Sequence, residues 1–209
     1  MKIEQTTMPS MEERILLCAE QMFMERGFAG TNMSDIAASI GINRPTLHYY
    51  FRTKDKLFQT VLGRLLLSFV PRVYGILSRS DLPISRRIEQ VIDAYIVLFM
   101  KHPCLPLFMA REIQRDSAFL LQMARREQID HYVHKIIRSL QAEMDEGKLK
   151  KVPLLTVFYT FYGLLVFPFL TRKLAEDILL EKGETFEDIL AMWKGQVVKQ
   201  IGNLLDVDA

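Results

Sequence analysis

A short stretch of the chain, residues 44 to 49, combines side chains that donate and accept hydrogen bonds: Arg44, Thr46, His48 and Tyr49. Arginine can pair with the edge of guanine, and threonine offers a base both a hydroxyl and a methyl group. Lys and Arg side chains close by would neutralise phosphates. These residue types together fit the recognition of nucleic acid.

Positive charge gathers around the same stretch. Residues 1 to 42 hold three basic and six acidic side chains, whereas residues 43 to 56 hold four basic side chains and Asp55 alone. The net charge of the whole chain is only +2, so the local surplus is the informative feature.

Two short helices are predicted to position these side chains. Asn32 caps the first helix, and Gly41 ends it because glycine enters the left-handed region without a steric penalty. Asn43 caps a second helix that begins at about Arg44 and tolerates Pro45 in its first turn. Residues 32 to 51 thus predict a helix-turn-helix whose second helix enters the major groove of DNA. The alternative is an amphipathic helical hairpin without a partner.

The sequence GFAGTNMSDIAASIGINRPTLHYYFRTKDKLF, from Gly27 to Phe58, resembles the DNA-binding domain of the TetR family of bacterial transcription regulators. The positions that match the family pattern are Ala19, Phe23, Gly27, Asn32, Ile36, Ala37, Gly41, Asn43, Thr46, Leu47, His48, Tyr50, Phe51, Lys54, Leu57 and Phe58. Two of these depart from the usual residue: Asn32 replaces a hydroxyl residue, and His48 stands where tyrosine is usual.

The resemblance implies roles for individual residues. The DNA-binding set is Asn32, Ser34, Asn43, Arg44, Pro45, Thr46, His48, Tyr49, Tyr50 and Lys54. Arg44, Pro45, Thr46 and Tyr49 would face bases, with Ser34 a weaker candidate, whereas Asn32, His48, Tyr50 and Lys54 would hold phosphates. A phosphate contact from His48 would make binding mildly pH-dependent. The alternative for Tyr50 is a ring that serves the core of the domain.

The remainder of the chain indicates an all-α protein with a large core. It has 209 residues, 49% of them hydrophobic, and no convincing strand pattern. Cys18 and Cys104 fit neither a metal site nor a disulfide framework, and the N-terminus lacks a signal peptide, so we expect a cytoplasmic protein.

We expect a three-helix DNA-binding domain over residues 1–56 and a larger helical domain for ligand binding and dimerisation over 57–209. Ser10 and Glu13 predict a capping box for the first helix, and a fourth helix begins near Lys54, with Pro71 as a kink or end. Further helices are predicted over about 84–101, 105–115, 117–146, 153–174 and 185–205.

The second domain is rich in aromatic and methionine side chains, and the family resemblance implies an inducer pocket there. The residues predicted to line it are Phe99, Met100, Phe108, Met109, Phe119, Met123, Phe158, Tyr159 and Tyr162. The alternative is that these side chains are simple core. The expected ligand is a small hydrophobic or amphipathic molecule.

The stretch from Val152 to Thr171 contains no charged residue and is long enough to span a membrane. Its prolines, glycine, threonines and tyrosines argue against a span, so we expect no membrane and a second subunit that covers this helix. With the last helix it would form a four-helix bundle, which is how the family dimerises. The predicted interface residues are Phe161, Leu165, Ile189, Trp193, Val197 and Ile201. An intrachain hairpin is the alternative.

The predicted function is a homodimeric transcription regulator that binds double-stranded DNA at a near-palindromic operator. The resemblance implies a repressor that a ligand releases, and activation is kept as an alternative. Two other classes remain: a helical sensor that acts through a protein partner, and a metal-dependent enzyme. The enzyme reading relies on Glu127, His131 and His134, spaced four and three apart. A solvated helix face explains these better, and we expect no cofactor, no metal and no catalytic residue.

Overall fold

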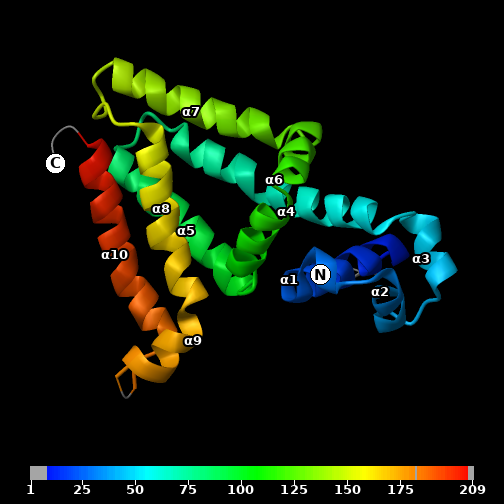
Figure 1. Ribbon diagram of the computed structural model, residues 1–209. Coiled ribbons are helices and arrows are strands. Elements are labelled where there is room, and N and C mark those ends of the chain that lie inside the picture. Colours follow the sequence, from blue (N-terminus) through cyan, green and yellow to red (C-terminus); the bar gives the residue numbers. More distant parts are fainter. Residues whose placement is uncertain (1–8, 182, 207–209) are drawn as a thin grey trace, which may run out of the picture. The chain divides into compact units, whose positions relative to one another are not determined.

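The computed structural model describes residues 9–181 and 183–206, and this part of the chain is helical and has no strand (Figure 1). The helices are α1 (Met11–Gly30), α2 (Met33–Ser39), α3 (Arg44–Tyr50), α4 (Lys54–Leu77), α5 (Ile84–Lys101), α6 (Leu105–Arg126), α7 (Ile129–Asp145), α8 (Leu154–Leu170), α9 (Arg172–Leu174) and α10 (Phe186–Leu205), with a π-helical turn over Ala175–Leu179. The predicted all-α fold is confirmed.

The chain packs as two compact units. The first unit consists of the described residues up to Leu67 together with Phe108–Glu127, and the second unit consists of Ser68–Leu107 together with the described residues from Gln128 on. Helices α4 and α6 therefore each contribute to both units. The domain boundary predicted between residues 56 and 57 stays a prediction, and the structure adds the α6 segment to the helix-turn-helix unit.

The core of the first unit is aromatic. The Phe23 and Phe58 side chains are fully buried, with their ring centroids 5.0 Å apart in an edge-to-face arrangement. Two rings of α6, Phe108 and Phe119, lie 6.0 and 5.9 Å from Phe58. Such contacts between rings add to the burial of apolar area, so α6 is an integral part of this core.

Helix α1 begins as predicted, but its capping box is incomplete. The Ser10 hydroxyl accepts a hydrogen bond from the Glu13 amide at 3.2 Å. The Glu13 carboxylate does not return to Ser10 and instead receives two hydrogen bonds from the Arg64 guanidinium, at 2.8 and 2.9 Å. This charged pair holds the pKa of Glu13 below its usual value, and it connects the start of α1 to α4.

One helix break lies where the sequence predicted it, and a second was not predicted. Asp116, with φ −161° and ψ 79°, kinks α6 at the predicted break, and its carboxylate accepts the Phe119 amide. The helix predicted over 117–146 is interrupted a second time at Gln128, whose φ of 57° separates α6 from α7. Pro71 does not end α4, which continues to Leu77.

The second unit is built around α5, α8 and α10, and α10 packs against both other helices (Figure 1). The Thr185–Asp188 capping box predicted for α10 is present. The Trp193 indole donates to the Leu164 carbonyl at 2.8 Å, which fixes α10 on α8. A predicted helix boundary also changes here, because α8 ends at Leu170 and a π-helical turn follows α9.

One described helix, Lys54–Leu77, is long and apolar enough to cross a membrane by length and composition alone. Two bent helix pairs also pass this test when each pair is counted as one span, and the second pair contains Leu154–Leu170. In α4, the Leu57 and Leu62 side chains of the apolar face are buried in the protein, and Arg64 forms its ion pair with Glu13.

Candidate functional site

The helix-turn-helix is held by caps that lie within three residues of the groups they serve. Asn32 accepts the Asp35 amide at 2.9 Å at the start of α2, and Asn43 accepts the Thr46 amide at 2.8 Å at the start of α3. Gly41 turns the chain between them with φ 72°, in the left-handed region that favours glycine. The local sequence therefore determines where both helices begin and where the turn occurs.

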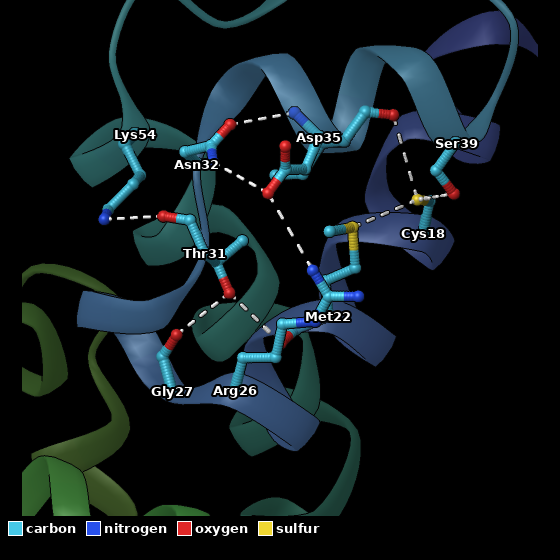
Figure 2. Close-up of polar contacts among 10 residues, drawn as sticks. Cys18, Met22, Arg26, Gly27, Thr31, Asn32, Asp35, Ser39 and Lys54 are labelled. Carbon is cyan, nitrogen blue, oxygen red and sulfur yellow. Dashed lines mark hydrogen bonds and ion pairs between the residues drawn. The ribbon is translucent and has the colours of Figure 1, made fainter.

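Figure 2 shows how the end of α1 is fastened to the start of α2 and α4. The Thr31 hydroxyl is buried and lies within hydrogen-bond distance of the Met22 and Gly27 carbonyls, at 3.1 and 2.9 Å. The Lys54 ammonium donates to the Thr31 carbonyl at 2.7 Å and lies 4.2 Å from the centre of the Phe28 ring. Lys54 is thus already part of the scaffold, with two of its three N–H donors left over.

The exposed face of α3 carries most of the predicted recognition residues. The Tyr49 side chain is 83% exposed, and Arg44 and Pro45 are also exposed. Thr46 is half-buried, and Tyr50 is 39% exposed, with its ring edge-to-face against Tyr49. The alternative of a core-only role does not describe Tyr50.

Two predicted residues of this face bind each other. The Arg44 Nε–H donates to His48 Nε2 at 3.1 Å, and His48 Nδ1 lies 3.0 Å from the Arg52 carbonyl. This arrangement needs a neutral imidazole with its proton on Nδ1, because Nε2 must accept.

Asn32 and Ser34, at the start of α2, are both exposed. The Asn32 amide nitrogen donates to the Asp35 carboxylate at 2.7 Å, in addition to the capping contact (Figure 2). The side chain of Asn32 is therefore occupied on both sides by the cap, and Asp35 places a negative charge beside it.

A buried carboxylate that the sequence prediction missed joins α6 to α1. Gly27 kinks α1 with φ 72°, and the freed Phe28 amide donates to Glu112 Oε1 at 2.9 Å. The Glu112 side chain is only 2% exposed, and its second oxygen accepts from Arg115 Nε at 2.6 Å. The Arg115 guanidinium also lies 4.4 Å from the centre of the Phe28 ring. We call Glu112, Arg115 and Phe28 the α6 clasp.

The second unit contains a cavity of about 520 Å³, within the size range of small-molecule sites. Its lining is Val70, Val73, Leu77, Ile84, Ile88, Val91, Tyr95, Val133, Ile136, Ile137, Leu140, Leu154, Leu155, Val157, Phe158, Phe161, Tyr162, Ile201 and Leu205. These residues come from α4, α5, α7, α8 and α10. No lining residue has a charged side chain.

This cavity shares only two residues with the predicted pocket. Of the nine predicted residues, Phe158 and Tyr162 line the cavity, and the other seven lie elsewhere. Four of these belong to the first unit: Phe108, Met109, Phe119 and Met123. Phe99 packs on Phe169 with ring centroids 5.0 Å apart, Met100 is not among the lining residues, and Tyr159 is exposed. The helical spacing of apolar residues identified apolar helix faces, but it did not show which of these faces line a cavity.

Two tyrosines supply the polar groups of the cavity. The Tyr95 and Tyr162 hydroxyls are hydrogen-bonded to each other at 2.5 Å, from α5 and α8. Burial raises the pKa of both phenols, and for Tyr95, which also faces Tyr162, the pKa rises well above its usual value. Both groups are therefore neutral at physiological pH.

Three residues of the predicted dimer interface face the interior of the single chain instead. Leu165, Val197 and Ile201 are buried, and Ile201 lines the cavity. Their contacts are made within the chain, where α10 packs on α5 and α8. Phe161, Ile189 and Trp193 are half-buried and keep some free surface. The intrachain hairpin, kept open as an alternative, explains the buried stripe.

The spacing of Glu127, His131 and His134 does not place them on one helix, because the break at Gln128 lies between the glutamate and the histidines. Glu127 accepts hydrogen bonds from Arg126, and His134 Nδ1 lies 2.8 Å from the Asp130 carbonyl. Within the part of the chain that the structure describes, no group of three or more His, Cys, Asp or Glu side chains could hold a metal ion.

Comparison with known proteins identifies the helix-turn-helix. Residues 15–61 match the family of bacterial regulatory proteins named tetR. The DNA-binding part of the chain belongs to the TetR family. The match covers α1 to α3 and the start of α4, the part of the first unit that carries the exposed α3 face.

Two relatives show how the sequence identity varies with the length of the chain that is matched. The chain is 40% identical over 52 residues to the HTH-type transcriptional repressor BepR of Brucella suis, a match that covers 25% of each chain. It is 23% identical over 175 residues to YttP of Bacillus subtilis, a probable HTH-type transcriptional regulator, covering 81% of this chain and 82% of the relative. The higher identity therefore extends over only a quarter of the chain.

The fold of the whole TetR chain is shared with solved structures. The transcriptional regulator FadR of Bacillus subtilis, in complex with stearoyl-CoA, has a TM-score of 0.67 and 16% identity and covers 90% of this chain and 96% of its own. TetR-family regulators bind DNA and small molecules and typically dimerise. Family membership thus implies a ligand-responsive transcription factor rather than an enzyme.

Proposed function

We propose that this TetR-family chain is a cytoplasmic, homodimeric repressor that leaves a near-palindromic operator when a small apolar molecule enters the second unit. The observation that carries the proposal is the exposed α3 face, with Arg44, Thr46 and Tyr49 on a helix whose start and turn are fixed locally. A twofold dimer presents two such helices about one DNA turn, roughly 34 to 36 Å, apart.

In this proposal the side chains divide between bases and phosphates. Arg44, Thr46 and Tyr49, with Pro45 against a thymine methyl, read base edges in the major groove. Lys54 and Tyr50 bind phosphates, and Lys54 does so while it keeps its contact with Thr31. The Arg44 Nε–H donates to His48, which leaves the Nη donors of the guanidinium for a base.

The proposed dimer uses the outer faces of α8 and α10. Phe167 and Met192 are 65% and 66% exposed, and Leu170, Leu174 and Tyr159 are exposed on the same stretch of chain. Large exposed apolar patches mark interaction surfaces, and a second copy of the chain would cover this one. Phe161, Ile189 and Trp193 remain in the proposed interface at its edge.

Helix α4 and the α6 clasp supply a route that couples ligand binding in the cavity to the position of the α3 helices. The N-terminal part of α4 packs in the first unit through Leu57 and Phe58, and its C-terminal part lines the cavity through Val73 and Leu77. A ligand that shifts α4 would thereby change the spacing of the two α3 helices. By linkage, the ligand must bind the DNA-free arrangement more tightly.

Fluorescence polarization with DNA from the region next to the gene tests the proposal. Wild-type protein should bind with an affinity that falls steeply with added salt. Arg44→Ala should weaken binding, whereas Arg138→Ala, an exposed arginine of α7, should not. If binding were equal in both variants, or absent in the wild type at low salt, the proposed surface would be rejected.

A further inference from the structure

The cavity of the second unit combines an apolar wall with a single polar point. Its wall consists of Val, Leu, Ile and Phe side chains apart from Tyr95 and Tyr162. These two hydroxyls lie together, one from α5 and one from α8. A molecule in this space can therefore form hydrogen bonds at one place only.

The hydrogen-bonding capacity of the tyrosine pair is only half used. Two phenol groups carry two O–H protons, and one proton is used in the bond between Tyr95 and Tyr162. The second O–H has no acceptor among the described residues. Because a buried donor without a partner is unfavourable, this proton is available to an acceptor on a bound molecule.

Charge is excluded from the same space. Arg87 precedes the lining residue Ile88 in the sequence, and its side chain is buried together with that of Glu143. The two charges neutralise each other through two hydrogen bonds. Arg87 also donates to the Leu77 carbonyl at 2.8 Å. A carboxylate or ammonium group inside the cavity would lose its water without gaining a charged partner, which is strongly unfavourable.

The cavity also has a way in. Four of its lining residues are at the same time exposed: Val133 and Ile137 of α7, and Leu155 and Phe158 of α8. Because these side chains face both the cavity and the surface, the opening lies between α7 and α8. An apolar entrance would favour uncharged molecules even before they reach the tyrosines.

We propose that the effector of this protein is an uncharged, mainly hydrocarbon molecule with one carbonyl or ether oxygen, which accepts a hydrogen bond from the Tyr95–Tyr162 pair. This inference rests on the proposed function, because it identifies the chemical class of the ligand that would release DNA. It excludes free carboxylates as effectors at neutral pH.

Three compounds with the same phenyl and alkyl skeleton test the inference: butyrophenone, butylbenzene and 4-phenylbutyrate. Each is titrated against full-length protein loaded with the uncharged fluorescent probe N-phenyl-1-naphthylamine, at pH 7.5 and without DNA. Butyrophenone should displace the probe at a concentration roughly three- to tenfold lower than butylbenzene, which is the usual strength of one hydrogen bond. 4-Phenylbutyrate should be at least about tenfold weaker than the ketone.

The variant Tyr95→Phe/Tyr162→Phe should bind butyrophenone and butylbenzene equally, because both donors are gone and the rings remain. Tyr132→Phe is the matched control, since this tyrosine of α7 does not line the cavity, and it should behave as the wild type. Thermal unfolding confirms that each variant is folded. If the double variant does not fold, the comparison of the three compounds on wild-type protein still decides.

Equal affinity for the ketone and the carboxylate, or a ketone preference that survives in the double variant, would overturn the inference. Its failure is distinct from failure of the proposed function. DNA binding by the ligand-free wild type tests the function alone, and salt-dependent binding with no ketone preference would leave the function standing and the ligand class rejected.

Discussion

The helix-turn-helix of the first unit and the packed helices of the second unit are held by polar contacts that differ greatly in their separation along the sequence. In the first unit, the caps of α2 and α3 join residues three positions apart, such as Asn43 and Thr46. In the second unit, the decisive polar pairs join distant residues: Arg87 and Glu143 are 56 positions apart, and Tyr95 and Tyr162 are 67 apart. Contact with DNA needs a locally defined helix, whereas a cavity is formed only when several helices pack.

The largest expected effect concerns the buried ion pair of the second unit. Arg87→Met leaves the buried Glu143 carboxylate without its partner and should lower the free energy of unfolding by about 3 to 5 kcal/mol. The neighbouring Arg86→Met removes an exposed pair with Glu89 and should cost less than about 1 kcal/mol. Urea unfolding followed by circular dichroism, at one fixed protein concentration, measures both. Similar losses in the two variants would contradict the contrast.

The α6 clasp is a long-range contact of the first unit, because it joins Phe28 to Glu112 across 84 positions. Glu112→Ala should destabilise the protein by about 2 kcal/mol, since a buried amide loses its acceptor and Arg115 loses its partner. Glu112→Gln keeps an acceptor for the Phe28 amide and should cost less. Hydrogen exchange at the Phe28 amide distinguishes them, and unchanged protection in Glu112→Ala would refute the clasp.

Sequence reasoning was most successful where the structure is local. It predicted both caps, the turn at Gly41, the start of α1 and the all-α fold. It did not predict the Glu112 contact, because nothing near Ala110 or Arg111 indicates that this helix turn meets the kink at Gly27. Of its nine predicted pocket residues, only Phe158 and Tyr162 line the cavity of the second unit, since periodicity cannot tell a packed face from one that borders a cavity.

A third prediction examines the exposed face of α3. Arg44→Ala should weaken binding to the operator by about 1 to 3 kcal/mol, the usual contribution of one bidentate contact with guanine. Lys54→Ala should instead weaken binding to all DNA sequences and reduce the salt dependence. Competition with unrelated DNA separates the two results. A uniform loss for Arg44→Ala would move this residue from base recognition to phosphate binding.

The smallest expected effect concerns the hydrogen bond between Arg44 and His48. His48→Phe keeps a flat ring but removes the Nε2 acceptor that holds the Arg44 guanidinium, so DNA affinity should fall by about threefold, the lower end of what one hydrogen bond contributes. Polarization titrations at constant ionic strength measure it, and an unchanged affinity would show that this contact does not position Arg44 for DNA.

The central claim is that two copies of the exposed α3 face act together on DNA. DNase I footprinting of wild-type protein on the region next to the gene tests it most directly. The account predicts two protected half-sites of near-palindromic sequence, with centres about one helical turn apart, and loss of both in Arg44→Ala. Protection of a single half-site, or a footprint that Arg44→Ala leaves intact, would contradict the account.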